Sequence, residues 1–479
     1  MIATQQLRYY PLTHAQKRIW YSEMMYPDQE MSNVGYIIKF TQPKDHFIME
    51  KAINQVLFSN PGLRVHLKDL AGDRSNIQQY IAEYHWVTLE RWRVFSMDEL
   101  LEKTGRIHHE KFDLFDKDLF YIAILQFADG KLGLYVKMHH IIVDGVSAVL
   151  IIQQILKYYQ ALLNGENIAV EENPSYIQYI NYEEKYLCSE KFCKDEQYWL
   201  EKFKTVPEGT TVAKARDSLV NMRVKRQYYS FNPDLQKKVY EFIKDSGSNL
   251  FILLTAALMV YCSRFLRKTE IVVGRAVHNR MNQHFRKMVG MFVTNLPFRI
   301  SINENLTFDQ MVKRMQNELW RDLRHQEYPY DLLVNKLRES NYGFQNLINI
   351  QISENPSFQA KENEIIQHYF AEYQQTELFF LLNPRNRDEL EIALDYQCSK
   401  FADSDIDALM HRLLVIMENL IDNSKKLIRE IPTVNKEEYY QVVNTFNNTK
   451  QDYPNQSIPK QFKTIVGKYS DQFAVKSAV

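Results

Sequence analysis

The feature that most constrains the fold is a strand, a tight corner and a helix in immediate succession over residues 132–159. In residues 132–138, apolar side chains recur at every second position, which predicts a β-strand with one apolar face. In residues 146–159 they recur at helical spacing instead. Gly145 lies between the two patterns, where it permits a tight backbone, and the helix start offers unpaired N–H groups. We therefore expect an α/β unit with a polar corner at its turn.

Two histidines and one aspartate occupy this corner. If the alternation of the strand continues, His140 falls on its apolar face and His139 on the opposite face. An imidazole in apolar surroundings loses its charge and becomes a neutral base near physiological pH. Asp144 either contacts that imidazole or pairs with an arginine that fixes the corner. A lone buried histidine is more often structural than catalytic, but a histidine pair at a strand end, followed by Asp-Gly, favours a catalytic site.

A second copy of this spacing occurs at residues 108–113. His108, His109 and Asp113 repeat the arrangement of two histidines and an aspartate. The copy lacks the following glycine, and it follows a charged segment with helical character instead of a strand. We therefore expect it to lie on the surface and to be coincidental.

The composition sets the broad class. The chain has 479 residues, of which 45% are hydrophobic and 25% charged, and its formal net charge is zero. This is typical of a soluble globular protein with roughly two to three domain-sized units, and it does not indicate binding to nucleic acid or to a charged membrane surface. The four cysteines lack metal-site spacing and indicate a reduced, cytoplasmic protein. The longest apolar run, residues 250–262, is too short to span a membrane and predicts a buried helix.

The corner motif, His-His-x-x-x-Asp-Gly at residues 139–145, resembles the signature of nonribosomal peptide synthetase condensation domains, which are relatives of chloramphenicol acetyltransferase. Other motifs of this family have counterparts in the same order along the chain, at residues 11–20, 59–65, 176–179, 288–299 and 324–331. One of them departs from the family pattern, because Ser-Asn-Pro at residues 59–61 stands where Arg-His-Glu is usual. The resemblance covers about residues 1–475 and rests on the joint order of the motifs.

The resemblance implies an α/β fold of two chloramphenicol acetyltransferase-like lobes, arranged as a V-shaped pseudo-dimer with a tunnel between them. We assign residues 1–173 to an N-terminal lobe that carries the corner motif and residues 174–435 to a C-terminal lobe. Residues 436–479 resemble the linker and the truncated start of an adenylation domain. The chain is therefore expected to be the front piece of a larger synthetase.

The resemblance also implies roles for the corner residues. Amide formation requires a free amine to attack a thioester carbonyl and to lose a proton while a tetrahedral oxyanion forms. His140 is the expected general base, or it orients the amine, and His139 supports it from behind. Asp144 holds the corner, and the N–H of Gly145 is a candidate donor to the oxyanion.

Further residues are expected to serve this site. In the family an arginine pairs with the motif aspartate, which makes Arg64 the candidate structural partner of Asp144; the alternative is an ordinary surface arginine. Asn295 and Arg280 are expected to bind substrate at the interface of the lobes. Aromatic residues of the second lobe are candidates for the lining of an apolar channel, among them Phe292, Phe298 and Tyr330.

Among condensation domains, the chain is most similar to the starter domains of lipopeptide synthetases, on residues 10–21, 290–293 and 324–330. Starter domains lie at the front of an assembly line, and Met1 is only nine residues before Tyr10. They transfer a fatty acyl group from acyl-CoA to an amino acid held as a thioester on a carrier domain.

This assignment implies a set of partners. No metal or tightly bound cofactor is expected; phosphopantetheine is delivered by the carrier domain, and CoA carries the acyl group. The expected partners are the peptidyl carrier domain, an adjacent adenylation domain and fatty acyl-CoA. We expect no nucleic acid, no membrane span and a monomer.

Three alternatives remain open. An elongation condensation domain would take a peptidyl donor from a carrier domain. A free CoA-dependent acyltransferase fits the corner motif but not the adenylation-like tail. A non-catalytic docking platform of the same fold usually has a degraded motif, and His140 counts against it. The heterocyclising variant has aspartates in place of both histidines and is excluded.

Overall fold

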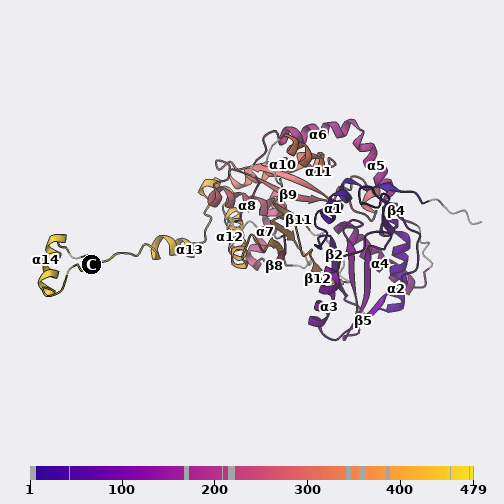
Figure 1. Cartoon of the computed structure of the whole chain (residues 1–479), viewed down its shortest axis with the longest axis horizontal. Coiled ribbons are helices and arrows are strands. Elements are labelled where there is room, and N and C mark those ends of the chain that lie inside the picture. The colour runs from indigo at the N-terminus through magenta and orange to yellow at the C-terminus, as the bar shows by residue number, and fades with distance from the viewer. Residues whose placement is uncertain are drawn as a thin grey trace, which may run out of the picture. The chain divides into compact units, whose positions relative to one another are not determined.

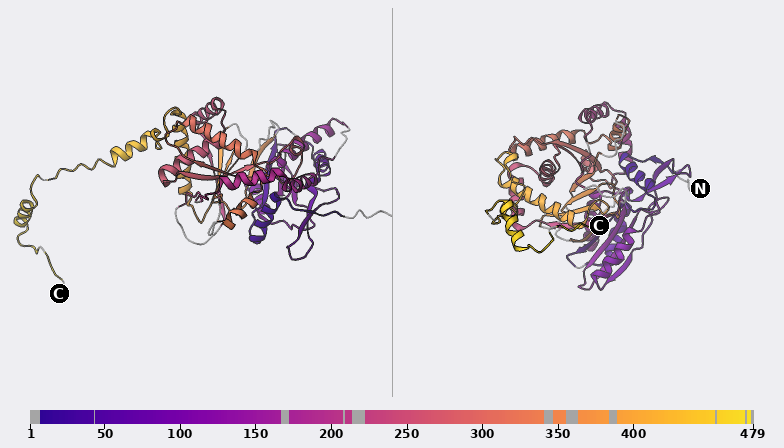
Figure 2. Two further views of the ribbon diagram at one scale, coloured as in Figure 1. Left: turned by 90° about the horizontal axis from the view of Figure 1, so that it is seen from above. Right: turned by 60° about the vertical axis from the view of Figure 1, so that its left-hand side comes forward.

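A computed structural model describes residues 7–42, 44–166, 172–207, 209–213, 222–340, 347–354, 363–383, 389–453, 455–473 and 475–477. The chain divides into two compact units, Met1–Thr433 and Val434–Val479. The first unit contains two lobes side by side, each with its own sheet and helices (Figures 1 and 2). The fold is mixed α/β, as expected.

The first lobe is built on a five-stranded sheet in the order β12-β2-β7-β6-β5. Four of its strands come from the first part of the chain, namely β2 (Asn33–Phe40), β5 (Glu90–Val94), β6 (Phe120–Phe127) and β7 (Leu132–His139). The strand predicted over residues 132–138 is β7, and all its residues are buried because helices cover both faces of the sheet. Helices α2 (His46–Ser59) and α4 (Gly145–Leu163) pack on one face, and α3 (Met97–His109) packs on the other.

Helix α4 confirms the helix predicted from residue 146. By length and composition it could cross a membrane, as could the bent pair of α7 (Pro233–Ser246) and α8 (Leu250–Leu266). Its apolar residues instead pack against α2 and the sheet in the core of the first lobe. The apolar residues of this long helix are therefore accounted for by packing in the core of the first lobe.

Smaller elements complete the first lobe. Helix α1 (His14–Met25) begins at Thr13, whose side chain accepts the N–H of Gln16 in a capping box. Strands β1 (Tyr10–Pro11), β3 (Val65–Asp69) and β4 (Ile77–Ile81) form a three-stranded sheet, and the short helix η1 (Pro61–Arg64) leads into β3.

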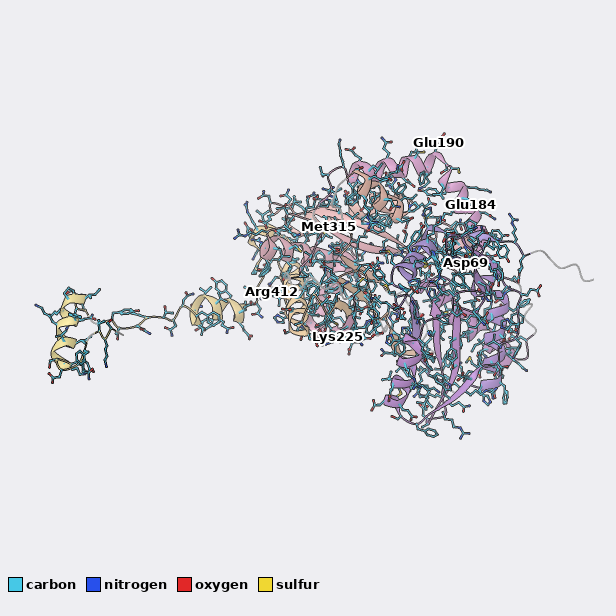
Figure 3. The ribbon with its side chains drawn as sticks, in the orientation of Figure 1. Asp69, Glu184, Glu190, Lys225, Met315 and Arg412 are labelled. Carbon is cyan, nitrogen blue, oxygen red and sulfur yellow. The ribbon has the colours of Figure 1, made fainter. Side chains whose placement is uncertain are left out.

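The second lobe is built on a six-stranded sheet in the order β10-β9-β11-β13-β14-β8. Its strands are β8 (Val224–Ser230), β9 (Glu270–Val277), β10 (Thr294–Ser301), β11 (Ile350–Glu354), β13 (Leu378–Leu382) and β14 (Glu391–Gln397). Its helices are α5 (Ile177–Leu187), α6 (Glu190–Lys202), α7, α8, α9 (Gln283–Arg286), α10 (Phe308–Arg324), α11 (Tyr330–Ser340) and α12 (Asp403–Asp422). The apolar run at residues 250–262 is the buried face of α8, as predicted. Met315 of α10, labelled in Figure 3, is fully buried in the same core.

One strand departs from the expected division of the lobes at residue 173. Strand β12 (Asn363–Tyr369) lies within the sequence of the second lobe, but it pairs antiparallel with β2 at the edge of the first sheet. The sequence of an edge strand does not identify the strand with which it pairs, because every open sheet edge offers the same backbone N–H and C=O groups. The second lobe is thus not one continuous segment.

The second unit has little internal structure. It contains α13 (Lys436–Tyr440), a π-helical turn at Gln441–Thr445 and α14 (Ile458–Lys468). Within its described residues none of these elements has a buried side chain. A segment of this size cannot form a stable core alone.

Candidate active site

His140 lies in the turn that follows β7. The strand ends at His139, so the side chain of His140 is not set by the strand alternation that the sequence suggested. Its backbone N–H donates to the Ser32 carbonyl (2.7 Å), and its Nδ1 lies 2.7 Å from the carbonyl oxygen of Val143. A carbonyl only accepts, so Nδ1 carries the ring hydrogen and Nε2 keeps its lone pair. The turn therefore presents a neutral imidazole with Nε2 as the base.

The surroundings keep this imidazole neutral. Burial of the ring lowers the pKa of His140, and the nearby charge of Arg18 lowers it further, against smaller opposing effects of Val143 and Asp144. Arg18 projects from α1, and its Nη2 donates to the Val293 carbonyl (3.3 Å). Arg18 lies in one of the family motifs but was not among the predicted site residues, because its position beside the corner depends on how α1 packs between the lobes.

His139 is buried behind the corner. Its Nδ1 accepts the N–H of Ile141 (3.2 Å), so Nε2 carries the hydrogen and lies 3.6 Å from Glu23 Oε1. Burial raises the pKa of Glu23, but His139 and Lys111 outweigh it and hold the pKa at about 2. His139 thus braces the turn through Glu23 and does not face the cavity.

Asp144 joins the corner to the second lobe through its hydrogen bonds. It caps α4 by accepting the N–H of Ser147 (2.8 Å) with Oδ1. The same oxygen accepts Arg280 Nη2 (2.7 Å), and Oδ2 accepts the N–H of Phe292 (3.2 Å). Asp144 is completely buried, so these three donors replace its water shell. The expectation that Asp144 holds the corner agrees with this geometry.

Two expectations about arginines are wrong. Arg64 does not pair with Asp144; its Nη2 lies 2.7 Å from Glu172 Oε1, and its Nη1 donates to the Ala82 carbonyl (3.0 Å). Arg280, in the loop between β9 and α9, pairs with Asp144 instead.

Arg280 is also not available to bind substrate. Its side chain is 1% exposed, and Nη1 donates to the carbonyls of Phe285 (2.8 Å) and Met288 (2.7 Å). Its guanidinium stacks 3.9 Å from the centre of the Phe292 ring. Arg280 and Phe292 therefore belong to the buried contact between the lobes.

A cavity of about 1070 Å³ lies in front of His140, with walls from both lobes. Its polar lining includes Arg18, His140, Gly145, His278, Asn295 and Arg275. Its apolar lining includes Met24, Met31, Tyr36, Ile352, Phe370 and Leu381. Tyr330 lines the cavity as expected, whereas Phe292 and Phe298 are fully buried in the packing of the second lobe and do not.

Two residues that line this cavity, Gly145 and Asn295, each have a polar group without a partner among the described residues. Gly145 is the first residue of α4, and among the described residues its N–H has no hydrogen-bond acceptor, as is usual in a first helical turn. Oδ1 of Asn295, on β10, also lacks a partner within the described chain. Asn295 thus lines the cavity, and its contact with substrate stays a prediction.

The comparisons with known proteins agree with this architecture. Residues 6–443 match the sequence model of the condensation domain, so the chain belongs to the condensation-domain family. Members of this family form amide bonds in nonribosomal peptide synthetases.

Two curated relatives come from Bacillus subtilis (strain 168). One component of plipastatin synthase is 30% identical over 458 residues, which cover 93% of this chain and 18% of that protein. The first component of surfactin synthase is 26% identical over 481 residues, which cover 98% of this chain and 13% of that protein. The chain thus spans less than a fifth of the length of these relatives.

Solved structures show the same fold. A variant of the starter condensation domain of rhizomide synthetase, in complex with C8-CoA, superposes with a TM-score of 0.77 at 22% identity, covering 88% of this chain and 97% of that one. The first condensation domain of the calcium-dependent antibiotic synthetase, in complex with a substrate analogue, gives 0.76 at 18% identity and covers 89% and 100%. The expected fold of two lobes is confirmed.

Proposed function

We propose that this domain transfers a fatty acyl group from acyl-CoA to the amino group of an aminoacyl thioester held on a carrier domain. The observation that carries the proposal is the free Nε2 of His140 at the wall of a large cavity shared by the two lobes. A base at this place can meet a donor and an acceptor at once. Binding both in one cavity replaces a bimolecular encounter with a near-unimolecular step.

The chemistry follows from the positions of the groups. The amino group of the aminoacyl thioester attacks the thioester carbonyl of the acyl-CoA. Its proton passes to Nε2 of His140 while that carbonyl oxygen becomes an oxyanion. The N–H of Gly145 and the charge of Arg18 stabilise that oxygen. Collapse breaks the carbon–sulfur bond, and the proton on His140 passes to the leaving thiolate, which restores the neutral imidazole.

The remaining site residues keep their roles as part of this proposal. His139 braces the turn, and Asp144 with Arg280 fastens the corner to the second lobe. Asn295 lines the cavity and is the proposed substrate contact from β10. Arg64 contributes to the first lobe through Glu172 and not to the reaction.

Two observations support a fatty acyl donor. The cavity wall carries apolar side chains from both lobes, including Met24, Met31 and Phe370, which suit an alkyl chain. A related starter domain of the same fold has been solved with C8-CoA. Each methylene buried in such a wall contributes about 0.8 kcal/mol.

The proposed setting follows from the same assignment. Phosphopantetheine arrives on a peptidyl carrier domain, CoA brings the acyl group, and residues 436–479 lead into an adenylation domain of a cytoplasmic lipopeptide synthetase. We propose that the domain works as a monomer.

A series of donors tests this function. The domain is incubated with one aminoacyl carrier protein and acyl-CoAs of increasing chain length, and the carrier is read by intact mass. We expect acylation to rise with chain length until the cavity is filled and then to fall. A peptidyl-carrier donor is run beside the series. If that donor is used and acyl-CoAs of every length are inert, the domain is an elongation domain.

A further inference from the structure

A buried group of metal-ligand type lies outside the active site. Glu30, His108 and His109 bring one carboxylate oxygen and two ring nitrogens within 4.8 Å of one another. The two histidines are the second copy of the corner motif. The expectation that this copy lies on the surface is wrong for His108, whose side chain is fully buried at the end of α3. The residues around His108 in the sequence are mostly charged or polar, so their pattern does not predict that its side chain is buried.

Neither ring nitrogen of His108 makes a hydrogen bond of normal geometry within the described residues, and the backbone of Phe370 comes near enough to oppose the lowering of its pKa by burial. Its ring stacks on Tyr369 of β12, with 4.8 Å between the ring centres, and it lies directly over Gly35 of β2. Complete burial disfavours the charged form of this ring. Buried polar groups normally have a partner, and a neutral imidazole is the form that binds a metal ion.

Glu30 retains one place for a cation. Its Oε1 accepts the N–H groups of Ser32 (3.0 Å) and Asn33 (2.7 Å). Its Oε2 accepts the N–H of Glu372 (3.1 Å), and among the described residues a second lone pair of this oxygen is unused. Three backbone N–H donors stabilise the charged form of this buried carboxyl group. The carboxylate is therefore charged.

The spacing of His109 and Glu30 is close to that of two ligands of one metal ion. Nδ1 of His109 lies 3.6 Å from Glu30 Oε2, beyond hydrogen-bond range, and it has no other partner among the described residues. Tetrahedral zinc with bonds of about 2.0–2.1 Å holds neighbouring ligand atoms about 3.3–3.4 Å apart. Small side-chain movements would bring all three atoms to that distance. His109 is partly exposed and offers a path for entry.

We propose that Glu30, His108 and His109 form a zinc site that fastens β12 to the first lobe. Two imidazoles and one carboxylate are a ligand set that suits Zn²⁺, with water in the fourth position. The site lies where Glu30 holds the backbone of Glu372, just after β12, and where His108 packs on Tyr369. The nearby ammonium of Lys137 opposes a cation and makes the site weaker than one with four protein ligands.

The test uses the full chain after treatment with a chelator. Zn²⁺ is titrated in competition with a chromophoric chelator, and Co²⁺ is titrated as a spectroscopic probe of tetrahedral coordination. We expect one Zn²⁺ per chain, a rise in melting temperature on binding, and at least about tenfold weaker binding in H109A and E30Q. H109A removes a partly exposed ring, so its fold should survive; its metal-free melting temperature checks this.

The chain offers a matched control. His66 Nε2 and His85 Nε2 lie 3.0 and 3.2 Å from the two oxygens of Asp118, which gives the same donor set, but these nitrogens already have a partner. H85A should therefore bind Zn²⁺ as the unaltered chain does. The proposal is overturned if no zinc binds, if H109A and E30Q bind as tightly as the unaltered chain, or if H85A alone abolishes binding.

Discussion

The buried pair of Asp144 and Arg280 makes a sharp prediction about stability. Arg280→Met removes the cation that is paired with a completely buried carboxylate, and it leaves the carbonyls of Phe285 and Met288 without their donor. Breaking a buried ion pair from one side typically costs about 3–5 kcal/mol. Since whole domains are stable by about 5–15 kcal/mol, this substitution should remove a large part of the free energy of unfolding.

Arg64→Ala is the matched control. Arg64 is 12% exposed and donates to the Ala82 carbonyl, but its ion-pair partner Glu172 is 55% exposed, so its removal should cost less, about 1–2 kcal/mol. Urea unfolding followed by tryptophan fluorescence measures both losses. The double variant D144N/R280M should lose less than the sum of the two single variants, because it removes both charges while the introduced asparagine side chain still caps α4. If Arg280→Met is no more destabilising than Arg64→Ala, the assignment of the buried pair is refuted.

Two further predictions concern catalysis. His140→Ala should reduce amide formation, measured by intact mass of the carrier, by about 10²–10⁴-fold with the fold intact; a loss below about tenfold would show that the ring only positions the amine. Because burial and Arg18 lower the pKa of His140, kcat/KM should hold as the pH falls past the usual histidine range near 6.5 and decline only below it. Arg18→Met should slow the reaction and move this decline to higher pH; an unmoved pH profile would show that Arg18 does not act on His140.

The local architecture of the site could be predicted from the sequence. The period-two pattern of residues 132–138 and the helical pattern after Gly145 correspond to β7 and α4. Asp144 stands at the helix start, where a carboxylate caps the free N–H groups of the first turn. These features depend on neighbours within a few residues, so the pattern of side chains is sufficient to specify them. The family resemblance rests on the same short segments.

The partners across the fold were decided only by the tertiary structure. Arg64 and Arg280 are equally able to pair with Asp144 by residue type, and the packing of the lobes selects Arg280. His108 looks like a surface residue in its charged segment, but the edge strand β12 covers it. Residue type and periodicity record which face of an element is apolar. They do not record which distant element covers that face, because that contact exists only once the chain has folded.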